Sequence, residues 1–103
     1  MAAQSHEAWR ARWLPELDAG IAPYVDALHR EGVETFESCE GGHGHAYAEP
    51  TVRFAGGREE GFRALAIALR HRFPVQAVRR YWAVIDGEPS GPAWELTFWR
   101  KAS

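Results

Sequence analysis

The sequence predicts an α+β fold, with an antiparallel four-stranded sheet and helices on one side of it. Two observations lead to this prediction. Three segments repeat apolar residues at helical spacing, and four others have the β-branched and aromatic residues typical of strands. In chain order they read helix, helix, strand, strand, helix, strand, strand, so sequential strands are expected to pair as antiparallel hairpins.

Length and composition indicate one globular domain. A chain of 103 residues has room for one hydrophobic core. We divide the domain into an N-terminal helical arm (1–22) and an α+β core (23–101). With 46% hydrophobic and 25% charged residues, the composition is that of a soluble protein. The net charge of −2 argues against bulk attraction to nucleic acid or to a membrane, so neither partner is expected.

The expected location is the cytoplasm. A single cysteine leaves no internal disulfide to support the fold. The first residues have neither a basic start nor an apolar run, and no stretch is long enough to span a bilayer.

Two helices are expected in the first third of the chain. The first begins after Ser5, which can cap it, and carries Trp9 and Trp13 one turn apart on one face. Pro23 suits the first turn of the second helix, which is expected over 23–31. If the first helix does not pack on its own domain, its two tryptophans become anchors for a partner or a second copy.

The first pair of strands is expected at 33–38 and 51–55. In the second of these, Val52 and Phe54 alternate with polar residues, which is the pattern of a half-buried strand. The glycine-rich segment between the two strands would close them as a long hairpin.

The clearest helix is expected over 58–72, ended by Pro74. Two long strands follow at 75–86 and 93–101, joined by the glycine- and proline-rich segment 87–92. The apolar face of the helix, defined by helical spacing, comprises Phe62, Leu65, Ala66, Leu69 and Phe73. The residues of the last strand that share one face are Trp94, Leu96 and Phe98.

The segment Ser38–Pro50 is the candidate functional site because it gathers groups that can bind a metal or move a proton. It holds the only cysteine, two of the five histidines and three of the ten glycines. The predicted ligand-binding residues in this segment are Ser38, Cys39, Glu40, His45, Tyr47 and Glu49.

A metal site is one hypothesis for this segment. Cys39, His45 and, more weakly, His43 supply the thiolate and imidazole ligands that zinc prefers, and Glu49 could add a carboxylate. The spacing matches no standard zinc module. The other histidines stand isolated in the sequence: His6, His29 and His71.

The glycines of the segment allow a second interpretation, a cradle of backbone amides for an anion. A strand follows them where phosphate loops lead into a helix, and two glutamates flank them, so a phosphate site is disfavoured. A site for a neutral or cationic small molecule, stacked on Tyr47, is the interpretation that stays open.

A catalytic interpretation would make Cys39 a nucleophile and His45 its base. The histidine would need an orienting carboxylate, which Asp86, Glu88 or Glu95 could supply only if the fold brought it close. No catalytic residue is assigned on this basis. In the competing structural interpretation, the glycines make the turn and Cys39 is a small buried residue.

Two blocks of sequence carry a resemblance. They are GVETFESCEGG (32–42) followed by GHAY (44–47) and EPTVRF (49–54), and VIDGEP (84–89) followed by WELTF (94–98). Together they resemble a family of small uncharacterised proteins from bacteria and their bacteriophages. The usual form of that family has glutamate where this chain has His43, so the resemblance does not make His43 essential. It implies a bacteriophage context, in which small proteins often bind host proteins or sequester small molecules.

The sequence therefore predicts a small cytoplasmic binding module whose Ser38–Pro50 loop forms a ligand or partner surface. One alternative is a homo-oligomeric interaction protein or inhibitor that contacts a second copy or a host protein through Trp9, Trp13 and the acidic loop. Another is a zinc-binding protein or a Cys/His-dependent enzyme, although no enzymatic activity is assigned.

Overall fold

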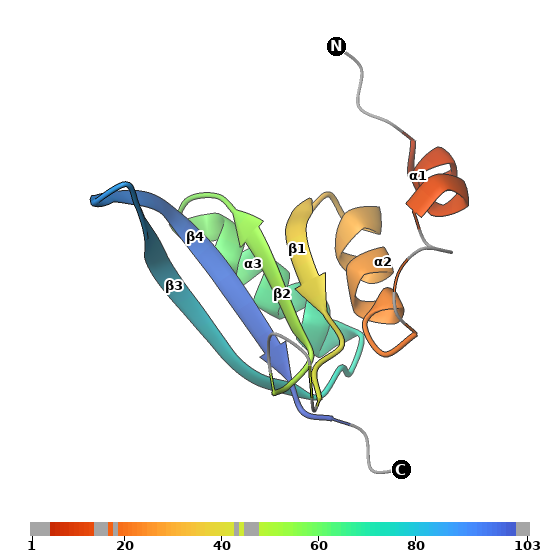
Figure 1. The fold of residues 1–103 in the computed structure, drawn as a ribbon. Helices are drawn as coiled ribbons and strands as arrows, with labels where there is room; N and C mark the ends of the chain where they lie inside the picture. The colour runs from red at the N-terminus through yellow and green to blue at the C-terminus, as the bar shows by residue number, and fades with distance from the viewer. Residues whose placement is uncertain (1–4, 14–16, 18, 43, 45–47, 101–103) are drawn as a thin grey trace.

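The computed structural model describes residues 5–13, 17, 19–42, 44 and 48–100, which form three helices and a four-stranded antiparallel sheet (Figure 1). The predicted α+β class and element order are therefore confirmed. The elements are α1 (His6–Trp13), α2 (Ala22–Arg30), β1 (Thr35–Cys39), β2 (Thr51–Ala55), α3 (Arg58–Arg70), β3 (Val75–Ile85) and β4 (Glu88–Phe98).

The sheet has the order β1-β2-β4-β3, so β1 and β3 are its two edges. The strands β1 and β2 form one antiparallel hairpin and β3 and β4 form another. The two hairpins are joined because β2 pairs with β4. The helices α2 and α3 lie against one face of this sheet (Figure 1). None of the helices in the described ranges is both long and apolar enough to cross a membrane.

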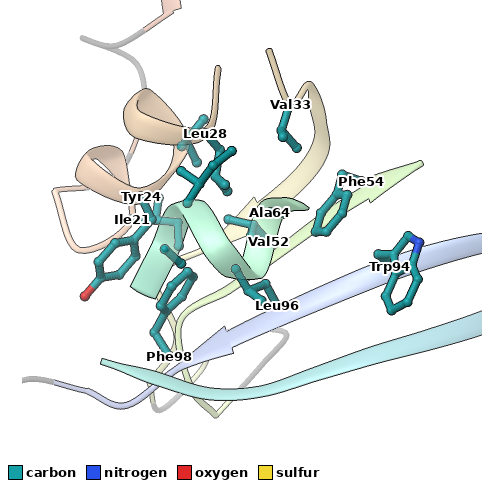
Figure 2. Packing of buried hydrophobic residues seen from close by; sticks show 13 residues of the cluster. Ile21, Tyr24, Leu28, Val33, Val52, Phe54, Ala64, Trp94, Leu96 and Phe98 are labelled. Atoms are coloured by element: carbon teal, nitrogen blue, oxygen red, sulfur yellow. The ribbon is translucent and has the colours of Figure 1, made fainter. Parts of the chain in front are cut away.

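The core lies between the two helices and the covered face of the sheet (Figure 2). The alternation predicted for β4 is confirmed, because Trp94, Leu96 and Phe98 are all buried. Val52 and Phe54 of β2 continue these rows, since Phe54 pairs with Trp94 and Val52 with Leu96. The helices and the adjoining loops add Ile21, Tyr24, Val25, Leu28, Val33, Ala64, Ile67 and Ala68.

The first two helices start as predicted. The Ser5 hydroxyl oxygen accepts a hydrogen bond from the Ala8 backbone N–H at 3.2 Å, which caps α1. Pro23 lies in the first turn of α2, and Gly32 follows that helix with a φ of 92°, a left-handed value that glycine adopts easily.

The predicted apolar face of α3 is wrong at three of its five positions. Phe62 and Leu69 are 53% and 56% exposed, and Ala66 is also exposed. The face that meets the sheet instead carries small residues, with Gly61 directly over the Trp94 ring. A Cβ built on Gly61 would lie 2.3 Å from ring atoms of Trp94, so only glycine allows this close approach. The residues of α3 that are buried are Gly61, Ala64, Ile67 and Ala68.

The predicted connection between the last two strands is also wrong. The strand β4 begins at Glu88 rather than at 93, and the turn is the dipeptide Asp86-Gly87. Their φ values are 52° and 79°, and positive φ at both positions is the requirement of the two-residue hairpin turn that matches strand twist. The β3–β4 hairpin is therefore longer than the sequence pattern indicated.

The contact between Gly61 and Trp94 predicts that Gly61→Ser destabilises the fold. Overpacking of this kind costs about 1–3 kcal/mol in the free energy of unfolding, whereas helix propensity alone would make serine the better residue. Urea unfolding of the two proteins measures the difference.

The matched control is Gly57→Ser. A Cβ at Gly57 meets nothing within 4 Å, and its φ of −77° suits any residue, so little change is expected. A Gly61→Ser protein as stable as the wild type would contradict the close helix–sheet contact.

Candidate functional site

The segment Ser38–Pro50 leaves the sheet where β1 ends and returns where β2 begins, beside the pair Cys39 and Thr51. Its neck is tight. Gly41 has a φ of 81°, and a Cβ on it would lie 2.4 Å from the Glu49 carbonyl carbon. The Gly42 backbone N–H donates to the Ala48 carbonyl oxygen at 2.9 Å. The glycine at 41 is therefore required by the turn itself.

Three of the predicted site residues, His43, His45 and Tyr47, lie outside the described residues. Their proposed roles in metal binding and stacking stay predictions, as does zinc as a cofactor. Within the described part of the chain, no group of three or more His, Cys, Asp or Glu side chains is placed to hold a metal ion.

The predicted site residues at the start of the segment point to different surroundings. Ser38 pairs with Val52 and lines a cavity beside α2, whereas Cys39 pairs with Thr51 and its Sγ lies 3.5 Å from the Gly41 backbone nitrogen. Adjacent strand residues face opposite sides of a sheet, which separates the two side chains. Glu40 lines a second cavity of about 270 Å³, together with Gly20, Tyr24 and Trp99 among others.

The remaining carboxylates considered for this site are Glu49, Asp86 and Glu95. The Glu49 Oε2 atom is buried and has no hydrogen-bond partner among the described residues. Asp86 lies in the turn of the β3–β4 hairpin, beyond the end of β2, so it is remote from the Cys39 end of the sheet. Glu95 pairs with Arg53 at 3.1 Å and with Arg79 at 3.3 Å, so it already holds two cations.

A larger cavity of about 490 Å³ lies along the free edge of the sheet, between β1 and the helices α1 and α2. Its lining combines aromatic rings, aliphatic side chains and two glutamates, without a lysine or arginine. The residues that line it are Trp9, Leu17, Val25, His29, Glu34, Thr35, Phe36, Glu37 and Ser38. Of the predicted site residues in the described ranges, Ser38 alone belongs to this set.

A stack of rings builds the helical wall of this cavity. The Trp9 ring lies on the His29 ring with centroids 4.2 Å apart and planes inclined by 11°. His6 stacks on both, at 5.6 Å from Trp9 and 5.4 Å from His29. Trp9 also packs against the core, so it docks α1 onto its own domain; the side chain of Trp13 lies outside the description.

The two histidines of the stack are within hydrogen-bonding distance of each other. Their Nδ1 atoms are 3.1 Å apart, and only one nitrogen of such a pair can carry the hydrogen. On its other side, the His6 Nε2 atom lies 3.0 Å from Asp26 Oδ1, close enough for an ion pair although not aligned as a hydrogen bond. Arg10 Nε approaches the same oxygen at 3.2 Å.

The environment of His29 favours its neutral form. Burial lowers the pKa of His29 below its ordinary value of 6.5, and the nearby His6 lowers it further. Glu34 and Asp26 act on this pKa in the opposite direction and only partly compensate. At neutral pH the cavity wall therefore presents an uncharged imidazole beside the Glu34 carboxylate.

Sequence reasoning missed most of this cavity. Trp9 and His29 were assigned to separate helices, and no periodicity links two residues so far apart. The clue that was available is the concentration of glutamate and phenylalanine in 34–37, which lies in and just before an edge strand.

Comparisons with models of protein families, with curated proteins and with solved structures found no match for this chain. The resemblance to bacterial and bacteriophage proteins, and the context that it implies, stay predictions.

The lowered pKa of His29 predicts a loss of stability in acid. The unfolded state binds the proton more readily than the folded state does, so this contribution is complete above pH 6.5 and is lost as the pH falls below that value. Urea unfolding at a series of pH values should show a steeper decline below pH 6.5 in the wild type than in His29→Gln. Parallel pH curves for the two proteins would contradict the assignment.

Proposed function

We propose that the protein is a small binding protein that holds a cationic organic group, an ammonium or a guanidinium, in the cavity between α1, α2 and β1. The observation that carries this proposal is the lining of that cavity. It joins the aromatic rings of Trp9 and Phe36 to the carboxylate of Glu34.

This lining suits a cation for two physical reasons. The face of an aromatic ring attracts a positive charge, by about 0.5–2 kcal/mol depending on how far water is excluded. The Glu34 carboxylate adds Coulomb attraction, whereas the Glu37 carboxylate is already paired with Arg53, whose Nη1 lies 3.5 Å from its Oε1. A neutral His29 adds no opposing charge. An anion would meet the Glu34 carboxylate and no lysine or arginine among the lining residues.

The size of the cavity supports a small ligand or one side chain of a larger one. Its volume of about 490 Å³ lies in the range of small-molecule sites. The cavity also borders β1, whose outer edge has no neighbouring strand in the part of the chain that the structure describes. An extended peptide could therefore lie along β1 and place an arginine or lysine side chain in the cavity.

The Ser38–Pro50 loop keeps a part in this proposal. Ser38 belongs to the cavity lining and is also the residue from which the loop starts. We propose the loop as one rim of the ligand or partner surface, in a cytoplasmic protein of bacteriophage context. The single cysteine, which permits no internal disulfide, is compatible with a reducing compartment.

Calorimetric titration with two probes tests the proposal. The probes are agmatine and a blocked pentapeptide with a central arginine, and the matched uncharged probe is the same peptide with a central citrulline. We expect the arginine peptide to bind more tightly than the citrulline peptide, because only the guanidinium carries a charge. Tighter binding of agmatine than of the peptide would identify a free small cation as the source.

The variant Glu34→Gln should weaken binding of the charged probe by up to about fivefold, the effect of about 1 kcal/mol for an exposed charge pair. Glu59→Gln on α3 removes the same charge away from the cavity, so it should leave the affinity unchanged. Equal affinity for both peptides, or no binding of either charged probe, would remove the proposal.

A further inference from the structure

The end of the β3–β4 hairpin projects past the rest of the sheet (Figure 1). The last residue of β2 to pair with β4 is Ala55, opposite Ala93. Beyond that point β3 and β4 pair only with each other, through Ala83 with Ser90 and Ile85 with Glu88. We call residues 82–92 the hairpin arm. The described sheet leaves the arm without a third strand to support it.

The arm exposes large apolar side chains. Trp82 is 55% exposed, Val84 74% and Ile85 57%. A two-stranded hairpin in water is only marginally stable by itself, and it gains stability when a further strand or an apolar surface covers it. The outer edge of β3 also has no neighbouring strand within the described ranges, so its backbone can accept one.

The charges around this apolar stretch are arranged with opposite sign at its two ends. Arg79 and Arg80 come directly before it, and Asp86 and Glu88 come directly after it. Two copies of such a strand, placed antiparallel about a two-fold axis, bring the basic end of each beside the acidic end of the other. The order basic, apolar, acidic is therefore complementary in charge to a second copy that runs antiparallel, and not to one that runs parallel.

We propose that two copies of the protein associate through the outer edges of their β3 strands, antiparallel and centred on Ala83. This register sets Trp82 of each copy opposite Val84 of the other, and it brings Arg80 of each copy beside the turn that holds Asp86 of the other. The charge complementarity identifies the partner as a second copy of this chain. The two sheets then form one continuous sheet of eight strands across the dimer.

The arrangement leaves the proposed ligand cavity open. The cavity borders β1 and the dimer forms at β3, and these are the opposite edges of the sheet. A result that contradicts dimer formation therefore leaves the proposal of cation binding unaffected, and the reverse is also true.

Sedimentation velocity over a range of protein concentrations tests the association. The wild type should sediment as a dimer at high concentration, and Val84→Glu should shift it to a monomer because two carboxylates would enter the apolar contact. The matched control is Leu69→Glu, which alters a side chain on α3 that is 56% exposed and lies outside the arm. A monomeric wild type, or a Val84→Glu protein that dimerises as well as the wild type, would overturn the proposal.

A pair of charge reversals tests the register. Arg80→Asp alone and Asp86→Lys alone should each dimerise less than the wild type, since each places like charges beside one another. Mixing the two variants should restore dimers, because both charge pairs are then of opposite sign. Failure of the mixture to associate, with both variants folded by circular dichroism, would exclude this register.

A cross-link gives a readout that does not require altered charges. In a Cys39→Ser protein, Ala83→Cys places one thiol on the two-fold axis, where opposed strand residues come within disulfide distance. Oxidation should give a covalent dimer at Ala83→Cys and much less at a cysteine introduced for Ala66 on the exposed side of α3. Equal cross-linking at both positions would count against pairing at β3.

Discussion

The close contact between Gly61 and Trp94 sets how the helices lie on the sheet. It brings α3 down onto β4, and the Trp94 Nε1–H then donates to the Gly57 carbonyl oxygen at 2.8 Å, at the start of that helix. The C-terminal end of α3 is tied to α2 in turn, because Arg70 and His71 both contact the Glu31 carboxylate. The position of α2 beside β1, and with it the cavity along that edge, follows from these connections.

The other face of the sheet is polar, which explains why no described helix covers it. One row of paired residues crosses all four strands with alternating charge, in the order Glu37, Arg53, Glu95, Arg79. The pair in the middle, Arg53 with Glu95, is the least exposed to water, and the outer pairs are more exposed. Each exposed pair contributes little stability by itself. Their joint effect is to make this face unsuitable for an apolar partner.

The two edges of the sheet also differ in what lies beside them. Along β1, the helices α1 and α2 stand close enough to form a cavity, and a β-bulge between Thr35 and Glu37 interrupts the edge. Register shifts also occur in the β3–β4 pair, one of them between Tyr81 and Ala83, so bulges do not distinguish the two edges. Along β3 none of the described helices lies beside the arm (Figure 1), and the apolar residues there are flanked by charges of opposite sign. The two proposals, ligand binding and self-association, therefore concern opposite edges of the sheet.

The sequence by itself determined the fold class, the order of the elements and the alternation of β2 and β4, because these depend on local spacing. The contacting face of α3 was decided by tertiary structure: a glycine carries no hydrophobic signal, yet the ring of Trp94 leaves room for nothing larger. The grouping of functional side chains was decided in the same way. Neighbours such as Ser38 and Cys39 separate because a strand alternates its faces, whereas Trp9 and His29 meet because α1 folds back on α2.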